Sequence, residues 1–205
     1  MAAPLAKISH SFHRFQAPRF VKDISHVQTL AAKTDETIAS FRQRGLFNRY
    51  CGPFTVHNYL HLSDSPVPVD SILRHFNLSD VNQRGSHAVK LRDAICACSH
   101  RVPIESNRLS NEQIDEILSE GSPIAVLLKG PLENHWLTLV GSDEFRYLAL
   151  DYRQILPFDK REFPNYCLKF LYYPSHIKRK RGIEPSTEIP FLTSQPAKLH
   201  HRSRV

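Results

Sequence analysis

The chain of 205 residues lacks the features that several large protein classes require. Its longest uninterrupted aliphatic run, Ile124–Leu128, covers five residues, whereas a helix that spans a bilayer needs about 20 apolar residues. No apolar stretch near the start has the form of a secretory signal peptide. We therefore expect no transmembrane segment, and a protein that is cytoplasmic or exported without a classical signal peptide.

Cysteine is scarce, with four in the chain, and a single residue separates Cys96 from Cys98. Four cysteines do not make a disulfide framework at this length, so we expect a reducing compartment. Together with His100, this pair lacks the spacing of a zinc knuckle, and no second ligand pair follows it. Glycine-rich phosphate loops and serine-hydrolase motifs are also absent. We therefore predict neither a metal nor another cofactor.

Charge is abundant but unevenly placed. The net charge is +7, and residues 174–205 hold seven Lys or Arg and two Glu, so this segment carries +5 and the other 173 residues carry +2. The run Lys178–Arg181, the prolines and the serines of this segment are typical of a chain that does not pack. We predict a disordered basic tail over 175–205 that could bind nucleic acid or another acidic surface weakly.

The N-terminal segment, residues 1–22, contains four basic residues, two prolines and no acidic residue. Prolines at positions 4 and 18 would interrupt an amphipathic helix, so we predict a flexible basic N-terminus. The folded domain is therefore expected to span 23–174.

Within that domain the hydrophobic period changes once. Apolar residues recur at helical spacing over 25–42, 69–76 and 88–98, and a capping box formed by Ser110 and Gln113 starts a further helix that ends at Gly121. The segments beyond Gly121 with the pattern of strands are Pro123–Lys129, His135–Val140, Phe145–Asp151 and Cys167–Tyr173. Helices followed by an antiparallel sheet indicate an α+β fold.

One stretch, residues 47–60, combines a loop, a cysteine and a buried helix. Pro53 suits a first helical turn, and Phe54 and Tyr59 are among the apolar residues that follow. Cys51 then lies at the helix N-terminus, where unpaired N–H groups and the helix dipole favour an anion such as a thiolate. Cys51 is thus a candidate nucleophile, with a buried structural cysteine as the alternative.

A cysteine nucleophile needs a base. Of the twelve histidines, His135 is the best placed because it is the first residue of a predicted strand, at the open end of a predicted hairpin. The second arm of that hairpin ends at Asp151. A five-residue loop, Gly141–Phe145, places His135 directly opposite Asp151 on one face. A loop one residue shorter places them on opposite faces unless a bulge intervenes, and the sequence does not choose between these registers. A neighbouring carboxylate would orient the imidazole, as in a catalytic triad.

This ordered set resembles the papain-like cysteine peptidase superfamily, and in particular free-standing relatives of the bacteriocin-leader-processing peptidases. The shared features are a Cys-Gly-Pro start, here Cys51-Gly52-Pro53, and a tract of strands that contains a His-aromatic pair and ends in Asp, here 121–151. The likeness covers about residues 43–172. It implies a papain-like fold, a triad of Cys51, His135 and Asp151, a thioester acyl-enzyme, and a protein or peptide substrate.

The sequence departs from the family at the oxyanion hole. The family usually has a glutamine six residues before the cysteine, and this chain has Gly45 there. We predict that a loop shift lets Gln43 or Asn48 supply the side-chain donor beside the backbone N–H of Cys51. The transporter-linked members also carry membrane and ATPase domains that this chain lacks, so the resemblance is to a free-standing relative.

Three functions fit these residues. The first is hydrolysis of an amide bond by a peptidase or amidase. The second is deamidation or transamidation of a protein glutamine with the same triad, as in some papain-like secreted effectors. The third is a non-catalytic binding module that acts through its basic tail.

Overall fold

The computed structural model describes residues 17–130 and 133–174. The predicted tail, 175–205, and most of the predicted flexible N-terminus lie outside the described residues. Strand β1 (Arg19–Phe20) lies inside the segment 1–22 that was expected to be flexible, and it pairs with strand β4. The ordered part of the chain therefore begins before the expected boundary at residue 23.

Helices fill the first half of the described chain. They are α1 (Ile24–Ala32), α2 (Thr34–Gln43), α3 (Cys51–Leu62), α4 (Val69–Leu73), α5 (Leu78–Arg84) and α6 (Ala88–Ser99). The stripe predicted over 25–42 is two helices because Lys33, which caps both of them, leaves the helical conformation. Helix α5 was not predicted, since its seven residues bury one side chain fully, Val81.

The second half of the chain forms most of an antiparallel sheet. The helices and strands of this half are, in order, β2 (Ile104–Ser106), α7 (Asn111–Ser119), β3 (Ile124–Leu128), β4 (His135–Ser142), β5 (Arg146–Asp151), β6 (Gln154–Asp159), α8 (Phe163–Tyr166) and β7 (Cys167–Tyr172). The strand order is β2-β7-β3-β4-β5-β6, with β1 beside β4. The predicted α+β class is confirmed. The predicted capping box of Ser110 and Gln113 is also present at the start of α7.

Strand β6 escaped prediction, and its position explains why. It lies at one edge of the sheet, where Pro157 is tolerated because a proline at an edge costs no ladder hydrogen bond. Half-exposed side chains and a proline are weak strand signals in a sequence.

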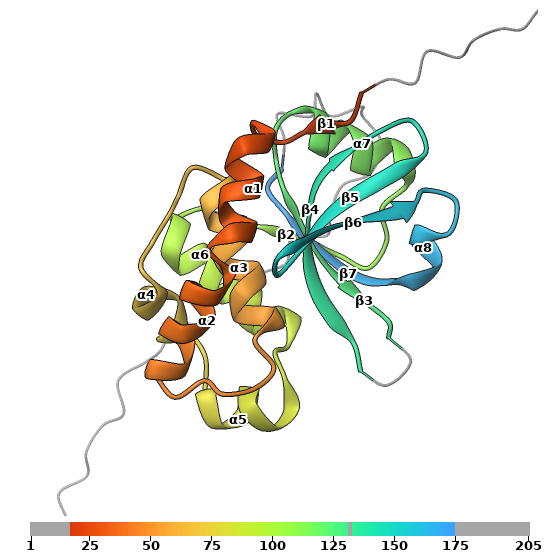
Figure 1. Cartoon of the computed structure of the whole chain (residues 1–205). Helices are drawn as coiled ribbons and strands as arrows, with labels where there is room; N and C mark the ends of the chain where they lie inside the picture. Colours follow the sequence, from red (N-terminus) through yellow and green to blue (C-terminus); the bar gives the residue numbers. More distant parts are fainter. Residues whose placement is uncertain (1–16, 131–132, 175–205) are drawn as a thin grey trace, which may run out of the picture. The chain divides into compact units, whose positions relative to one another are not determined.

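Helix α3 is the centre of the helical layer. Figure 1 shows α1–α6 gathered on one side of the strands, with α7 and α8 on the other. Nine of the twelve residues of α3 are buried. Tyr59 and Leu60 share a hydrophobic cluster with Leu91 of α6 and Trp136 of β4. Since each buried side chain of this size contributes about 1.5–3 kcal/mol to folding, this packing holds α3 against the sheet.

The register of the β4–β5 hairpin differs from both predicted alternatives. Thr138 lies opposite Leu150, and a β-bulge between Leu139 and Gly141 adds one residue to β4. Continued by one residue, this register places Asp151 opposite Leu137, two residues along from His135. Because side chains alternate along a strand, His135 and Asp151 are diagonal neighbours on one face. The direct pairing of His135 with Asp151 was therefore wrong, and the bulge restores their common face.

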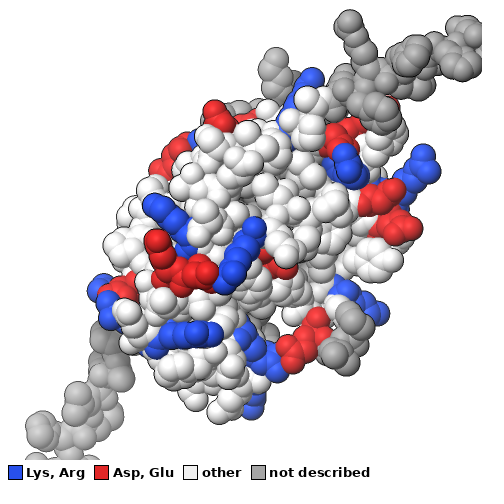
Figure 2. All heavy atoms as spheres, in the orientation of Figure 1, with Lys and Arg blue, Asp and Glu red and all other residues white. Residues whose placement is uncertain are grey.

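Charge on the folded body is nearly balanced. On the face drawn in Figure 2, basic and acidic side chains alternate, and neither sign forms a continuous patch. The described part of the chain therefore shows no basic surface of the kind that binds nucleic acid on this face.

Candidate active site

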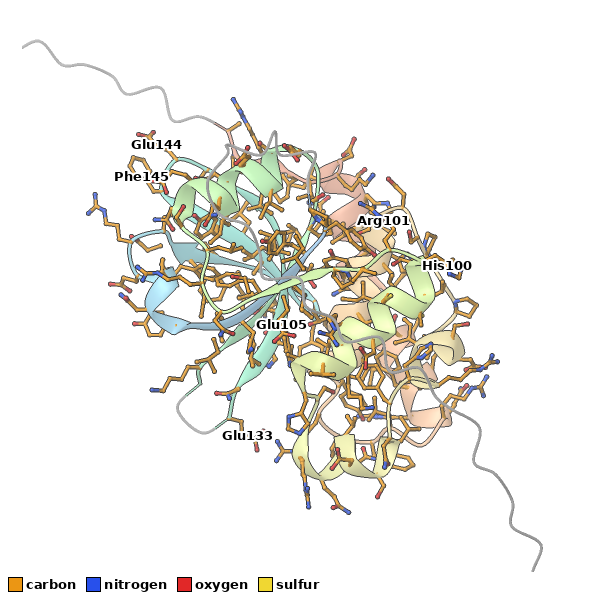
Figure 3. All side chains as sticks on the ribbon, turned by 180° about the vertical axis from the view of Figure 1, so that it is seen from behind. His100, Arg101, Glu105, Glu133, Glu144 and Phe145 are labelled. Atoms are coloured by element: carbon orange, nitrogen blue, oxygen red, sulfur yellow. The ribbon has the colours of Figure 1, made fainter. Side chains whose placement is uncertain are left out.

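A cleft of about 850 Å³ lies between the start of α3, the α5–α6 connection and the start of β4. Figure 3 shows Glu133 at the end of the strands nearest α5, and Glu144 and Phe145 at the far end of the β4–β5 hairpin. The first residue of β4 and the last residue of β5 therefore lie at the same end of the sheet as Glu133. This end of the sheet forms one wall of the cleft.

Cys51 enters the cleft as the first residue of α3. It is partly exposed, whereas Gly52 and Pro53 behind it are buried. Its backbone N–H belongs to the first turn, whose donors have no acceptor within the helix. The sequence placed this cysteine correctly because proline and the apolar residues that follow fix where the helix begins.

The loop before Cys51 is held by Asn82 of α5. The Asn82 amide oxygen accepts hydrogen bonds from the backbone N–H groups of Phe47 and Asn48, at 2.8 and 3.0 Å. Its amide nitrogen donates to the carbonyl of Gly45 at 2.9 Å. One side chain thus fixes three backbone groups of the loop. Asn82 could not be identified from the sequence, because a single Asn in a short helix has no distinguishing pattern.

His135 bridges the two other candidate residues. Its Nε2 lies 2.9 Å from Oδ1 of Asp151, and the Cys51 thiol lies near enough to affect the ring. The hydrogen bond to Asp151 first and the interaction with Cys51 second raise the pKa of His135 to about 10, against the opposing effect of burial. The structure thus brings Cys51, His135 and Asp151 together, with Cys51 and His135 lining the cleft.

Tyr152 also lies beside His135, and it was not predicted to belong to the site. Its ring centroid lies 6.1 Å from that of His135 and 5.1 Å from that of Phe54. Burial first, and then the nearby Cys51 and Asp151, raise the pKa of its hydroxyl. Its backbone φ of 48° is left-handed, a conformation that is uncommon outside glycine and recurs at functional sites.

The predicted oxyanion donors are not brought to the cleft. Gln43 is the exposed last residue of α2, and Asn48 is exposed with its backbone bound by Asn82. Neither residue lines the cleft. The expected loop shift is therefore wrong, because Asn82 fixes the loop in a position that leaves both side chains outside.

A hydrogen bond from Trp136 ties the start of β4 to the opposite wall of the cleft. The Trp136 indole N–H donates to the backbone carbonyl of Ser86 at 2.9 Å. Trp136 follows His135 directly, so this bond fixes the start of β4 against the α5–α6 connection. The two walls of the cleft are thus held at a set separation.

Residues 17–130 and 133–174 have neither a cluster of metal-ligating side chains nor a membrane-spanning helix. In this part of the chain, no group of three or more His, Cys, Asp or Glu side chains has an arrangement suited to a metal ion. The Cys98 thiol instead donates to the carbonyl of Ser71, at 3.7 Å. The same residues contain no helix with the length and hydrophobicity needed to cross a bilayer.

Comparisons with known proteins show similarity to a solved structure but to no known family. No family model and no curated protein matches the chain. The chain is similar in structure to the peptidase domain of Streptococcus ComA, a bifunctional ABC transporter involved in a quorum-sensing pathway. The TM-score is 0.48 and the identity 16%, over 62% of this chain and 93% of that domain. This likeness is distant, and the function proposed below rests on the geometry of the cleft.

Proposed function

We propose that the protein is a papain-like cysteine peptidase or amidase that hydrolyses an amide bond in a protein or peptide. The observation that carries this proposal is the position of His135, whose Nε2 lies 2.9 Å from Oδ1 of Asp151 while the Cys51 thiol lies near enough to raise the pKa of the ring. A thiol, an imidazole and a carboxylate joined in this order at the wall of a cleft have the arrangement that nucleophilic catalysis requires.

In the first half of the reaction, the Cys51 thiolate attacks the carbonyl carbon of the amide. A C–S bond forms, and the C–N bond breaks as the imidazolium of His135 gives its proton to the departing nitrogen. The acyl group is left on Cys51 as a thioester. Asp151 acts on His135 alone, where it orients the ring and favours its charged form.

In the second half, His135 is neutral and takes a proton from water. The resulting C–O bond releases the acid, the C–S bond breaks, and the thiolate and imidazolium return. The developing oxyanion is assigned to the backbone N–H of Cys51 at the start of α3. Because removal of one oxyanion donor typically costs about 10²–10³ in rate, a site without the family's glutamine is expected to be slow.

The proposal is tested with the wild-type protein and the variants Cys51→Ala and His135→Ala, each incubated with a complex peptide mixture and analysed by mass spectrometry. We expect new peptide termini, or glutamines converted to glutamate, with the wild type alone. Glutamate formation would identify a side-chain amide as the bond attacked. Equal products with all three proteins, or none with the wild type, would contradict the proposal.

A further inference from the structure

An ion pair spans the cleft between the two segments that carry Cys51 and His135. Arg49 Nη1 lies 2.5 Å from Oε2 of Glu133, and Nη2 lies 2.6 Å from Oε1. Arg49 precedes Cys51 by two residues, and Glu133 precedes His135 by two residues. Both line the cleft, and Figure 3 shows Glu133 at the end of the sheet that faces the helices.

We infer that Arg49 and Glu133 are positioning residues that set the distance and orientation between the Cys51 thiol and the His135 ring. Two residues of chain span at most about 7 Å, so a displacement at either end of this pair reaches the neighbouring functional side chain. Two parallel hydrogen bonds between a guanidinium and a carboxylate fix the angle between the groups as well as their separation.

Arg49 is the fixed member of the pair. Its backbone has a left-handed φ of 54°, its side chain passes Gly85, and the loop before it is bound by Asn82. Its side chain is 33% exposed, against 57% for Glu133. The pair therefore draws the start of β4 toward a rigid loop, and an ion pair this exposed adds little to folding stability.

Other ion pairs at the cleft do not have this geometry. Glu105 and Lys169 lie on the neighbouring strands β2 and β7, and Arg84 pairs with Asp80 within α5. Each of those pairs stays on one wall. Glu105 also lies 4.0 Å from Arg92 of helix α6, but Arg92 does not line the cleft. Among the described residues, Arg49–Glu133 is the ion pair whose two members both line the cleft and come from opposite walls.

The inference rests on the proposed function for the roles of Cys51 and His135, but its test measures thiol reactivity rather than turnover. Cys51 is alkylated with limiting iodoacetamide between pH 5.5 and 10, and peptide mapping gives its rate. The proteins are the wild type, Arg49→Gln, Glu133→Gln and the reversed pair Arg49→Glu/Glu133→Arg. The matched control is Arg44→Gln, which removes a two-bond pair with Asp70 on the outer surface.

At pH 6 we expect each single variant to slow alkylation of Cys51 about tenfold, because a well-placed imidazole activates a thiol and small misplacements at a reacting centre cost up to about 100-fold. At pH 10, where the solution itself deprotonates thiols, the rates should converge. The reversed pair should recover most of the loss, the control should match the wild type, and melting temperatures should be similar throughout.

Three results would overturn the inference: wild-type rates at pH 6 in both single variants, no recovery in the reversed pair, or equal slowing in the Arg44→Gln control. A failure of the proposed function would be seen differently. In that case Cys51 of the wild type would itself react no faster than Cys96, Cys98 and Cys167.

Discussion

Ser86 occupies the space that a side chain at Gly52 would need. A Cβ built on Gly52 would lie 2.3 Å from both Cβ and Oγ of Ser86, far inside van der Waals contact. The Ser86 hydroxyl is buried there without a hydrogen-bond partner among the described residues. The glycine that follows Cys51 is therefore required by the close approach of the α5–α6 connection to the first turn of α3.

This contact predicts whether the substitution Gly52→Ala stabilises or destabilises the protein. Helix propensity alone would make Gly52→Ala stabilising by about 0.5–1 kcal/mol, whereas overpacking of a buried contact costs about 1–3 kcal/mol. Packing should win, so we expect Gly52→Ala to lower the free energy of unfolding in urea titrations. The double variant Gly52→Ala/Ser86→Gly should regain much of the loss. A stabilised single variant would show that the connection moves aside freely.

The four thiols should differ in reactivity near neutral pH. Burial raises the pKa of Cys98 and raises that of Cys167 to about 12, so both are poor nucleophiles there. Cys51 is partly exposed and faces the imidazole of His135. Limiting iodoacetamide at pH 7 should label Cys51 first, as measured by peptide mass analysis. Faster labelling of Cys96 would remove the basis for Cys51 as the nucleophile.

The raised pKa of His135 links stability to alkaline pH. Its value is about 10 in the folded protein and about 6.5 in an unfolded chain, so the folded state holds the proton more tightly. The contribution of His135 is complete below pH 6.5 and is lost as pH rises through about 10. The difference in unfolding free energy between the wild type and His135→Gln should therefore shrink over that range. A difference that is constant from pH 6 to pH 10.5 would contradict this linkage.

The lowered pKa of His57 links stability to acid pH, in the opposite sense to His135. Burial first and His61 second lower the pKa of His57 to about 4, so the unfolded chain binds its proton more tightly than the folded one. Its contribution to stability is present above pH 6.5 and is lost as pH falls through about 4. In urea titrations, His57→Gln should flatten the acid limb of the stability profile. An unaltered slope in His57→Gln would mean that other groups set the acid limb.

The three candidate catalytic groups should act as a unit. Once a substrate is found, Cys51→Ala and His135→Ala should each abolish turnover, and Asp151→Asn should reduce it less, because Asp151 acts through His135. The double variant Cys51→Ala/His135→Ala should be little worse than either single variant, since losses within one catalytic group do not add. Steady-state rates with all four variants test this. Additive losses would indicate separate roles.

The position of Cys51 at the start of a helix could be predicted from the sequence because the signals are local. Pro53 and the apolar residues after it place the start of α3 at Cys51, and no distant contact is needed to read them. The choice of His135 and Asp151 followed from the same kind of local strand pattern. Their roles in catalysis remain predictions.

The details that escaped prediction depend on contacts between distant segments. The bulge between Leu139 and Gly141 sets the hairpin register, and nothing in the turn sequence specifies it. Gln43 and Asn48 were assigned to the oxyanion hole on the assumption of a movable loop. That loop is fixed by Asn82, which lies 34 residues from Asn48 along the chain.

The placement of Cys51 and His135 in different halves of the chain has a consequence for biosynthesis. The helices α1–α6 leave the ribosome before β4 and β5 are made, and 84 residues separate the thiol from the imidazole. Until the sheet is complete, the nascent polypeptide carries Cys51 without the imidazole of His135 beside it. If the proposed function holds, the emerging chain has no hydrolase activity until long-range strand pairing closes, which is a late event for contacts of this sequence separation.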